Sequence, residues 1–568
     1  MATNVASGRA QHGLDKEETK VIFASSLGTI FEWYDFYLYA VLAPFFAALF
    51  FPPGNATAAL LSAFAAYAAG FLVRPFGALV FGRVGDLVGR KYTFLVTIMV
   101  MGFSTFAVGL LPTYSQVGWL APILMVSLRL LQGLALGGEY GGAATYVAEH
   151  AKPGRRGFDT AWIQTSATLG LFLALLIIGL CRFSGVMTPA QFAEWGWRLP
   201  FLVSLLLLIF SIYIRLKLNE SPVFKKMKAE GKGSKQPLTD SFLRYPNNKL
   251  VLLTLLGATA GQGVVWYTGQ FYALFFLTIT LRVDGMTAYT LIAISLLLGT
   301  PFFIVFGALS DKIGRLKIIL AGCLIAALTF FPLFQALTHY VNPALETFAQ
   351  RNPITVQANE CSFHVFVTPF TKYTDCDRAK DYLTKSGLSF KSTNLPASST
   401  ENVVVTMGTN DIKFVGKDDK PGWNEATMAG ALVDAGYPGL TKMTDDKGVV
   451  SFANKPADKN AINWTMTLLI LFVLLIYVTM VYGPIAAFLV ELFPTRIRYT
   501  SMSLPYHIGN GWFGGMLPLL ATAMVAASGD IYYGLWYPIV VALMTVVVGT
   551  LFLRDNKDFD LHVERSAL

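Results

Sequence analysis

Long apolar runs recur along the whole chain and limit what it can fold into. Twelve of them cover residues 21–50, 57–81, 92–112, 119–147, 160–182, 197–216, 249–281, 286–308, 317–338, 463–490, 499–526 and 532–553. A helix needs about 20 apolar residues to cross the roughly 30 Å core of a bilayer, and these runs lack the alternation of barrel strands. With 54% hydrophobic residues, the chain is too apolar for a water-soluble globule. The sequence therefore predicts an all-α membrane protein of twelve transmembrane helices.

Basic residues are concentrated in alternate loops between these runs. Arg90 and Lys91 lie in the second loop and Arg315 in the eighth, whereas the first and third loops, near Pro52 and Pro112, carry neither lysine nor arginine. Lysine and arginine mark cytoplasmic loops, so both termini are expected on the cytoplasmic side of a plasma membrane, such as the inner membrane of a bacterium. The net charge of +9 follows from this topology, and no nucleic-acid partner is expected.

A short loop motif occurs twice and divides the chain into related halves. Residues 82–90 and residues 307–315 both read Gly, three residues, Asp, two residues, Gly-Arg, and each lies between two apolar runs. The predicted parts are a cytoplasmic tail without a cleaved signal peptide (1–20), a six-helix bundle (21–218), a flexible cytoplasmic linker (219–248), a second bundle (249–338 and 463–553), an insert (339–462) and a cytoplasmic tail (554–568).

Spacing within the repeat locates the insert. Asp86 precedes Glu149 by 63 residues, whereas Asp311 precedes the corresponding Glu491 by 180, so the second half carries about 117 extra residues. They are soluble in composition and follow an odd-numbered run, which predicts a small extracytoplasmic α+β lobe. We expect strands at 363–367, 388–390 and 403–407, and helices at 377–386 and 424–435.

The lobe contains two of the four cysteines, Cys361 and Cys376. In an oxidising compartment they could form a disulfide, and the sequence leaves open whether they do. A metal site is less favoured, because the nearby His364 and Asp375 do not form a spaced set of ligands.

Charged residues inside the first two runs need a reason, because each costs roughly 2.5–3.5 kcal/mol at a helix centre. Glu32, Asp35 and Tyr39 share one helix face, and beside them Tyr34 is a candidate for substrate contact. Asp35, and less strongly Glu32, suit proton coupling, while a static ion pair is the alternative. Arg74 could bind a substrate carboxylate at two points, extend its guanidinium group to the membrane surface, or form an ion pair with Asp35.

The fourth run carries a polar stripe within a glycine-rich stretch. Arg129, Gln132, Glu139 and Tyr140 place a cation, an amide, a carboxylate and a phenol along the helix. We expect Arg129 and Glu139 to form a functional pair, with Glu139 in proton coupling and Gln132 and Tyr140 at the substrate. Most of the glycines are expected to serve only helix packing.

Polar and aromatic side chains also interrupt the seventh and eleventh runs. The candidates for an uncharged wall of the substrate site are Gln262, Trp266, Tyr267, Gln270, Tyr506 and Asn510, with Tyr272, His507 and Trp512 beside them. Aromatic packing between helices is an equally good reading of any one of them.

No enzyme signature is present in the sequence. There is no phosphate-binding loop with Gly-Lys-Ser/Thr, no His-Glu-x-x-His, and no Gly-x-Ser-x-Gly in a strand-to-helix setting. We therefore expect no catalytic residues, no cofactor and no metal, and ATP is not the expected driving force.

Seven stretches in both halves resemble the metabolite:proton symporter branch of the major facilitator superfamily, which includes carriers for dicarboxylates, citrate, shikimate and betaine or proline. They are Phe31–Phe36, Val73–Pro75, Gly82–Lys91, Arg129–Gly133, Gly137–Tyr140, Asn219–Phe224 and Glu491–Arg496. The resemblance implies two six-helix bundles that rock about a midplane site, and proton-driven uptake of a small organic acid or zwitterion by a monomer.

The repeated loop is then expected to act as a gate. Asp86 would hold the two bundles together at the cytoplasmic surface through a helix N-terminus or an arginine. The predicted gate residues are Gly82, Asp86, Gly89, Arg90, Glu149, Asp311, Arg315, Glu491 and Arg496. Two departures from the family are the insert, which admits a ligand sensor as the alternative function, and the lack of a heptad-rich tail after Arg554.

Overall fold

The structure is a computed structural model. It describes residues 16–51, 56–152, 154–183, 187–359, 361, 374–396, 399–416, 422–446 and 448–557. The side chains of residues 16–18, 32, 40, 43–45, 47–48, 56–68, 182–183 and 189 lie outside this description, so the predicted role of Glu32 has no geometry to set against it.

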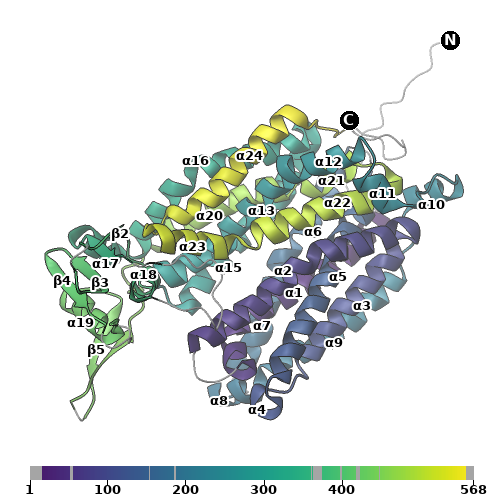
Figure 1. The fold of residues 1–568 in the computed structure, drawn as a ribbon. Helices are drawn as coiled ribbons and strands as arrows, with labels where there is room; N and C mark the ends of the chain where they lie inside the picture. The colour runs from purple at the N-terminus through teal and green to yellow at the C-terminus, as the bar shows by residue number, and fades with distance from the viewer. Residues whose placement is uncertain are drawn as a thin grey trace.

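Two helical bundles lie side by side, one from each half of the chain (Figure 1). The first contains α1 (Lys16–Phe50), α2 (Ala56–Leu87), α3 (Arg90–Val108), α4 (Tyr114–Val117), α5 (Leu120–His150), α6 (Arg156–Gln164), α7 (Ser166–Phe183), α8 (Pro189–Gln191), the π-helical η1 (Phe192–Gly196) and α9 (Arg198–Leu216). The tightest packing inside it is between α2 and α5, where glycines of α5 lie against the α2 backbone.

The second bundle begins with an irregular helix and is interrupted by the insert. Its members are α12 (Asn247–Thr254), η2 (Leu255–Thr259), α13 (Ala260–Tyr267), η3 (Thr268–Tyr272), α14 (Ala273–Phe275), η4 (Phe276–Thr280), α15 (Gly285–Ile313), α16 (Arg315–Val341), α20 (Trp464–Tyr482), α21 (Ile485–Leu492), η5 (Thr495–Ile497), α22 (Arg498–His507), η6 (Ile508–Gly514), α23 (Leu517–Ser528), η7 (Tyr533–Leu535) and α24 (Trp536–Phe552).

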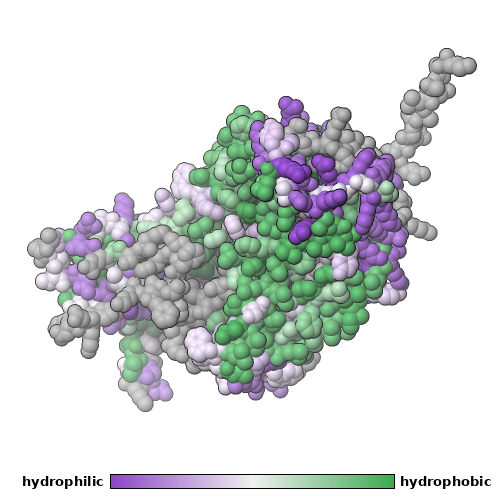
Figure 2. Space-filling model, turned by 45° about the vertical axis from the view of Figure 1, so that its right-hand side comes forward, coloured by the Kyte–Doolittle hydropathy of each residue, from purple (hydrophilic) through white to green (hydrophobic). Residues whose placement is uncertain are grey.

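The twelve predicted runs all correspond to helical segments. Among the described residues, ten segments are long and apolar enough to cross a membrane, and α1 and α2 add helices of 35 and 32 residues. Hydrophobic side chains cover the surface of the bundles, and hydrophilic ones gather at one end and on the lobe (Figure 2). Exposed side chains such as Leu206, Leu328 and Leu551 suit contact with lipid.

The linker is more ordered than its composition predicts. It contains α10 (Pro222–Ala229) and α11 (Pro237–Phe242), which lie at the end of the bundles opposite the lobe (Figure 1). Ser221 caps α10 by accepting a hydrogen bond from the Phe224 N–H, and Val223, Phe224 and Met227 are buried. The prediction of a flexible connector is therefore wrong for this segment, because an amphipathic helix inside it packs onto the bundles.

The insert forms a small α+β lobe at the other end (Figure 1). It comprises α17 (Pro343–Arg351), β1 (Ile354–Ala358), α18 (Asp375–Lys385), β2 (Phe390–Thr393), β3 (Val403–Met407), β4 (Asn410–Phe414), α19 (Glu425–Asp434), β5 (Leu440–Thr444) and β6 (Val450–Asn454). The strands of its main sheet run in the order β2-β1-β3-β4, with β1 parallel to β2 and the other pairs antiparallel. β5 and β6 form a separate hairpin.

The sequence anticipated part of this lobe. The predicted strand at 403–407 coincides with β3, whereas the one at 388–390 overlaps β2 only at Phe390 and the one at 363–367 lies outside the described residues. The strands β1, β4, β5 and β6 were not anticipated. A disulfide joins Cys361 to Cys376, with the two Cα atoms 5.2 Å apart.

The lobe is fastened to the second bundle around Arg282, in the loop between η4 and α15. The Arg282 guanidinium donates hydrogen bonds to the carbonyl oxygens of Lys385 (3.0 Å) and Gly439 (3.3 Å) and to the side chain of Asn454 (2.5 Å). The Phe390 N–H also donates to the carbonyl oxygen of Gly529, 2.7 Å away. The lobe and the second bundle are thus tied at two places.

We expect Arg282→Ala to loosen the lobe. The substitution removes three hydrogen bonds, one partly buried and two exposed, each worth about 1 kcal/mol or less, so the lobe should open more often and be cleaved faster by a protease. Lys385→Ala is the matched control, because its side chain forms an ion pair with Asp381 inside the lobe that is about half exposed and worth little. Equal cleavage rates for Arg282→Ala and the wild type would contradict the role given to Arg282.

Candidate functional site

A buried charge cluster lies in the middle of the first bundle. Asp35 of α1 is 2% exposed, and its carboxylate accepts hydrogen bonds from Arg129 Nη1 at 3.3 Å and from Gln132 Nε2 at 3.0 Å, both on α5. The Gln132 amide also donates to the Thr105 hydroxyl at 3.0 Å, and the Arg129 guanidinium lies 4.0 Å from the Tyr39 ring centre. The Asp35 carboxylate therefore has two hydrogen-bond donors on α5, and the charge of Arg129 balances its own.

A narrow pocket opens beside this cluster. It is lined by Asp35, Phe36, Gly70, Phe71, Arg74, Arg129, Gln132, Gly133 and Leu136. Two guanidinium groups face one carboxylate, so the charged lining has a net charge of about +1 when all three are ionised. Arg74 Nε, Arg129 Nε and Gln132 Oε1 are buried without a hydrogen-bond partner among the described residues. Such an arrangement favours a ligand with an anionic group and hydrogen-bonding oxygens.

The expected pair of Arg129 with Glu139 is wrong. Glu139 instead forms an ion pair with Arg215 of α9, at 2.6 Å, and accepts a hydrogen bond from the Thr97 hydroxyl at 2.8 Å. Seven residues are two helical turns, so Arg129 and Glu139 share a face but are about 10 Å apart along the axis. Glu139 lies outside the pocket, and its proposed part in proton coupling loses its geometric basis.

We expect Glu139→Gln to lower stability. It leaves the buried Arg215 guanidinium without its carboxylate, and breaking a buried ion pair in this way costs about 3–5 kcal/mol. Thermal unfolding of the purified protein should show the loss, while Glu194→Gln, a change at an exposed glutamate, should leave the unfolding temperature unchanged. A variant as stable as the wild type would show that the pair is not structural.

The two candidate tyrosines of the first bundle have other partners. The Tyr34 hydroxyl donates to the carbonyl oxygen of Pro200 at 2.6 Å, which turns this side chain into the bundle core rather than the pocket. Tyr140 stacks on Tyr506 of the second bundle with ring centres 3.8 Å apart, and its hydroxyl accepts from Gln164 at 2.8 Å. Tyr34 is therefore a packing residue, and Tyr140 belongs to the seam between the bundles.

Two of the candidates in the second bundle lie in π-helical turns, Gln270 in η3 and Asn510 in η6, and such turns are often found where helices carry functional side chains. Gln262 and Asn510 exchange two hydrogen bonds, at 3.1 and 2.8 Å. The Tyr37 hydroxyl donates to Gln270 at 3.4 Å, across the seam between the bundles.

The aromatic candidates line the same seam. Trp266 packs against Trp33 with ring centres 5.0 Å apart, Tyr267 against Phe71 at 6.0 Å, and the hydroxyls of Tyr506 and Tyr482 are 2.9 Å apart. These rings close the midplane between the two bundles.

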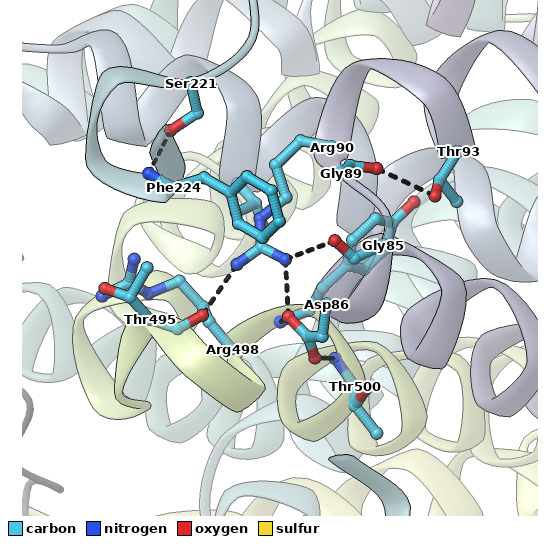
Figure 3. Close-up of polar contacts among 12 residues, drawn as sticks. Gly85, Asp86, Gly89, Arg90, Thr93, Ser221, Phe224, Thr495, Arg498 and Thr500 are labelled. Carbon is cyan, nitrogen blue, oxygen red and sulfur yellow. Dashed lines mark hydrogen bonds and ion pairs between the residues drawn. The ribbon is translucent and has the colours of Figure 1, made fainter. Parts of the chain in front are cut away.

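The first copy of the repeated loop joins the bundles at the end that carries the linker (Figure 3). The Asp86 carboxylate accepts hydrogen bonds from the N–H groups of Tyr499 (3.3 Å) and Thr500 (2.8 Å) at the start of α22, and from Arg90 at 2.6 Å. Arg90 also donates to the carbonyl oxygen of Thr495 at 2.7 Å. The carboxylate thus meets both an arginine and a helix N-terminus, which carries partial positive charge.

The second copy repeats this contact with the bundles exchanged. Asp311 accepts hydrogen bonds from the N–H groups of Gly157 and Phe158 at the start of α6, both at 2.9 Å, and pairs with Arg315 at 2.8 Å. Gly157 and Gly307 are in backbone contact, which a side chain at either position would prevent. Each half therefore binds the helix N-terminus of the other half.

Two acidic residues complete the crossed arrangement. Glu149 pairs with Arg498 at 2.8 Å, and Glu491 pairs with Arg156 at 3.5 Å and with Arg315 at 3.0 Å. The predicted gate residue Arg496 is exposed, so its assignment to the gate is wrong, and Arg498, which is fully buried, makes the contact with Glu149. The one-turn 3-10 helix η5 turns Arg496 outward and Arg498 inward.

Each copy of the repeated loop also contacts an acidic residue that follows the last membrane-spanning helix of the same bundle. Glu220 accepts hydrogen bonds from the Arg90 and Lys91 N–H groups at the start of α3, at 3.2 Å each. Asp555 accepts one from the Leu316 N–H at the start of α16, at 2.9 Å. Gly89 and Gly314 have φ values of 154° and 112°, and a Cβ at either position would collide with the acid, so glycine is required at both.

Comparisons with known proteins agree with this architecture. A model of the Major Facilitator Superfamily matches residues 25–341. The chain is 35% identical over 332 residues to the shikimate transporter of Escherichia coli (strain K12), an alignment that covers 56% of this chain and 72% of the relative. It is 35% identical over 322 residues to the alpha-ketoglutarate permease of the same strain, with coverage of 57% and 72%.

A third relative, named as a proline/betaine transporter of Staphylococcus aureus (strain MSSA476), is 38% identical over 311 residues, with coverage of 54% and 65%. Among solved structures, the proton:xylose symporter XylE bound to 6-bromo-6-deoxy-D-glucose superposes with a TM-score of 0.58 over 96% of this chain and 98% of its own, at 13% identity. At that identity the likeness concerns the fold alone.

Proposed function

Because this chain belongs to the Major Facilitator Superfamily, we propose that it is a proton-coupled symporter for a small organic acid or zwitterion. The family consists of multi-pass membrane transporters and not of enzymes, and the same holds for this chain. The proposal concerns the coupling ion, the substrate class and the residues that carry them.

The observation that carries the proposal is the buried Asp35 carboxylate beside the pocket. While Asp35 is ionised, it forms a 3.3 Å ion pair with Arg129, so the Arg129 guanidinium is engaged and less available to a substrate. A proton on Asp35 removes that charge and leaves Arg129 and Arg74 to bind an anionic group of the substrate. The proton and the substrate then strengthen each other's binding, because two ligands that favour the same state must do so reciprocally.

The substrate class follows from the lining of the pocket. Shikimate, alpha-ketoglutarate, proline and betaine, which the names of the relatives mention, all carry a carboxylate. Two arginines suit that group, and the rings of Phe36 and Phe71 suit the carbon skeleton. We therefore expect a small molecule with a carboxylate, as a free acid or as part of a zwitterion.

Alternating access would use the crossed contacts of the repeated loops. Their ion pairs and helix-end hydrogen bonds form only while the bundles are closed at the linker end, so this end opens when they break. A ligand sensor is not favoured, since relatives that match the bundles are named as a transporter and a permease.

Purified protein in liposomes with an imposed pH gradient, acidic outside, tests the proposal. Labelled shikimate, alpha-ketoglutarate, proline and glycine betaine should be tried one by one, with internal pH followed by a dye. We expect at least one to accumulate together with protons and to leak out when a protonophore is added. Uptake that needs a sodium gradient, or that moves no protons, would contradict proton coupling.

A further inference from the structure

His507 is a buried side chain whose ring nitrogens have no hydrogen-bond partner in the part of the chain that the structure describes. It ends α22, is 2% exposed, and neither imidazole nitrogen makes a hydrogen bond with a described residue. A buried polar group without a partner is rare in native proteins and calls for a reason. An unfilled ligand position is one such reason.

The packing of α2 against α22 and η6 places Arg74 opposite His507. A Cβ on Gly82 would lie 2.9 Å from the Thr500 Cα, and a Cβ on Gly511 would lie 3.2 Å from the Phe71 carbonyl oxygen. The two helices are therefore antiparallel with a constant offset, and position 74 faces positions 507 and 508. Among the charged residues of α2, Arg74 is therefore the one that lies level with His507.

Arg74 contacts the ring of Phe71, whose centre is 4.2 Å from the guanidinium carbon, but it has no acidic partner among the described residues. It is 9% exposed, its Nε is unsatisfied, and no carboxylate among the described residues is within ion-pair distance of its guanidinium. Asp35, the carboxylate in the same pocket, is held by Arg129 and Gln132. A buried cation beside a buried imidazole is unfavourable unless an anion comes between or beside them.

We propose that His507 and Arg74 bind one carboxylate of the substrate from opposite bundles. Arg74 would supply charge and two N–H groups, and His507 an N–H group. This deepens the proposed function, on which it rests, because it makes the substrate anion a bridge between the bundles. An empty carrier would lack that bridge, and the bound carboxylate would favour closure of the seam.

The decisive experiment places a carboxylate in the site permanently. His507→Glu should pair with Arg74, so we expect the purified variant to melt a few degrees above His507→Gln. Adding Arg74→Gln should erase that difference, whereas adding Arg83→Gln, which removes a charge from an exposed position of the same helix, should not. A His507→Glu variant that melts no higher than His507→Gln, or fails to fold, would overturn the proposal.

Ligand binding gives an independent measurement. Carboxylates that raise the melting temperature of the wild type should bind His507→Gln and Arg74→Gln about tenfold more weakly, and should no longer stabilise His507→Glu. The neutral methyl ester of each acid should lose the same advantage in the wild type. Unchanged affinity in both glutamine variants would contradict the proposal. If no carboxylate stabilises the wild type, the proposed substrate class fails, and the His507→Glu comparison still decides whether the site accepts a carboxylate.

Discussion

Asp35→Asn should abolish proton-driven accumulation of substrate while leaving exchange of labelled for unlabelled substrate. Asparagine keeps the shape of the side chain and an oxygen that can accept from Gln132, but it cannot take up a proton. The site of the variant would then resemble that of the protonated carrier both when it faces outward and when it faces inward. A one-proton symporter can accumulate substrate about tenfold per pH unit, and this ratio should fall to one.

The measurement compares uptake under a pH gradient with counterflow at equal pH in the same liposomes. Counterflow needs binding and alternating access but no net proton movement, so its survival also shows that the variant is folded. Asp381→Asn, at a half-exposed aspartate of the lobe, is the control and should accumulate substrate normally. Accumulation that persists in Asp35→Asn would remove Asp35 from the coupling role.

Helical periodicity identified the right polar faces but not the partners across helices. Asp35, Arg129 and Gln132 were singled out from the sequence, and the structure brings them together. Glu139 was paired wrongly because Arg215 comes from α9, near the end of an apolar run, where nothing local marks it as a partner. Such contacts depend on how the helices pack, which the period of one helix does not determine.

The gate residues were easier to predict from the sequence, because a motif that occurs in both halves indicates equivalent contacts in both. The repeated loop pointed to Asp86 and Asp311, and both lie at helix N-termini of the opposite bundle. Arg156 and Arg498 could also have been found, since they stand seven residues after Glu149 and Glu491, respectively. The comparison of spacings that located the insert would thus have identified Arg498, instead of Arg496, as the gate residue.

The strands of the lobe were harder to predict than its helices. α18 and α19 have strong sequence signals, with Thr374 and Asn424 as side-chain caps. The hairpin of β5 and β6 has mostly exposed side chains, so it lacks the alternation of buried and exposed residues that marks a strand. Its pairing and its place beside Arg282 come from tertiary contacts.

Asp86→Asn should shift the carrier strongly away from the state closed at the linker end. The carboxylate is buried and accepts hydrogen bonds from two backbone N–H groups of α22 and from Arg90. An amide directs its own N–H groups at some of these donors and removes the negative charge that faces the N-terminus of α22. A hydrogen bond to a charged group is worth about 1.5–3 kcal/mol, and the two that Asp86 accepts from α22 form only in the closed state. The closed population should therefore drop by roughly two orders of magnitude or more.

A cysteine in the seam reports this shift. Ser503 is buried against Gly141, so Ser503→Cys, with Cys181 and Cys323 replaced by serine, should react slowly with a membrane-impermeant maleimide while the bundles are closed. Adding Asp86→Asn should speed labelling from the linker side, and Asp311→Asn should do the same through α6, because the two contacts are equivalent with the bundles exchanged. Lys312→Gln removes an exposed charge from the second copy of the repeated loop and should change nothing. Labelling that stays slow in both asparagine variants would mean that the aspartates do not hold the bundles together, and closure would then have to rest on Glu149, Glu491 and the aromatic seam.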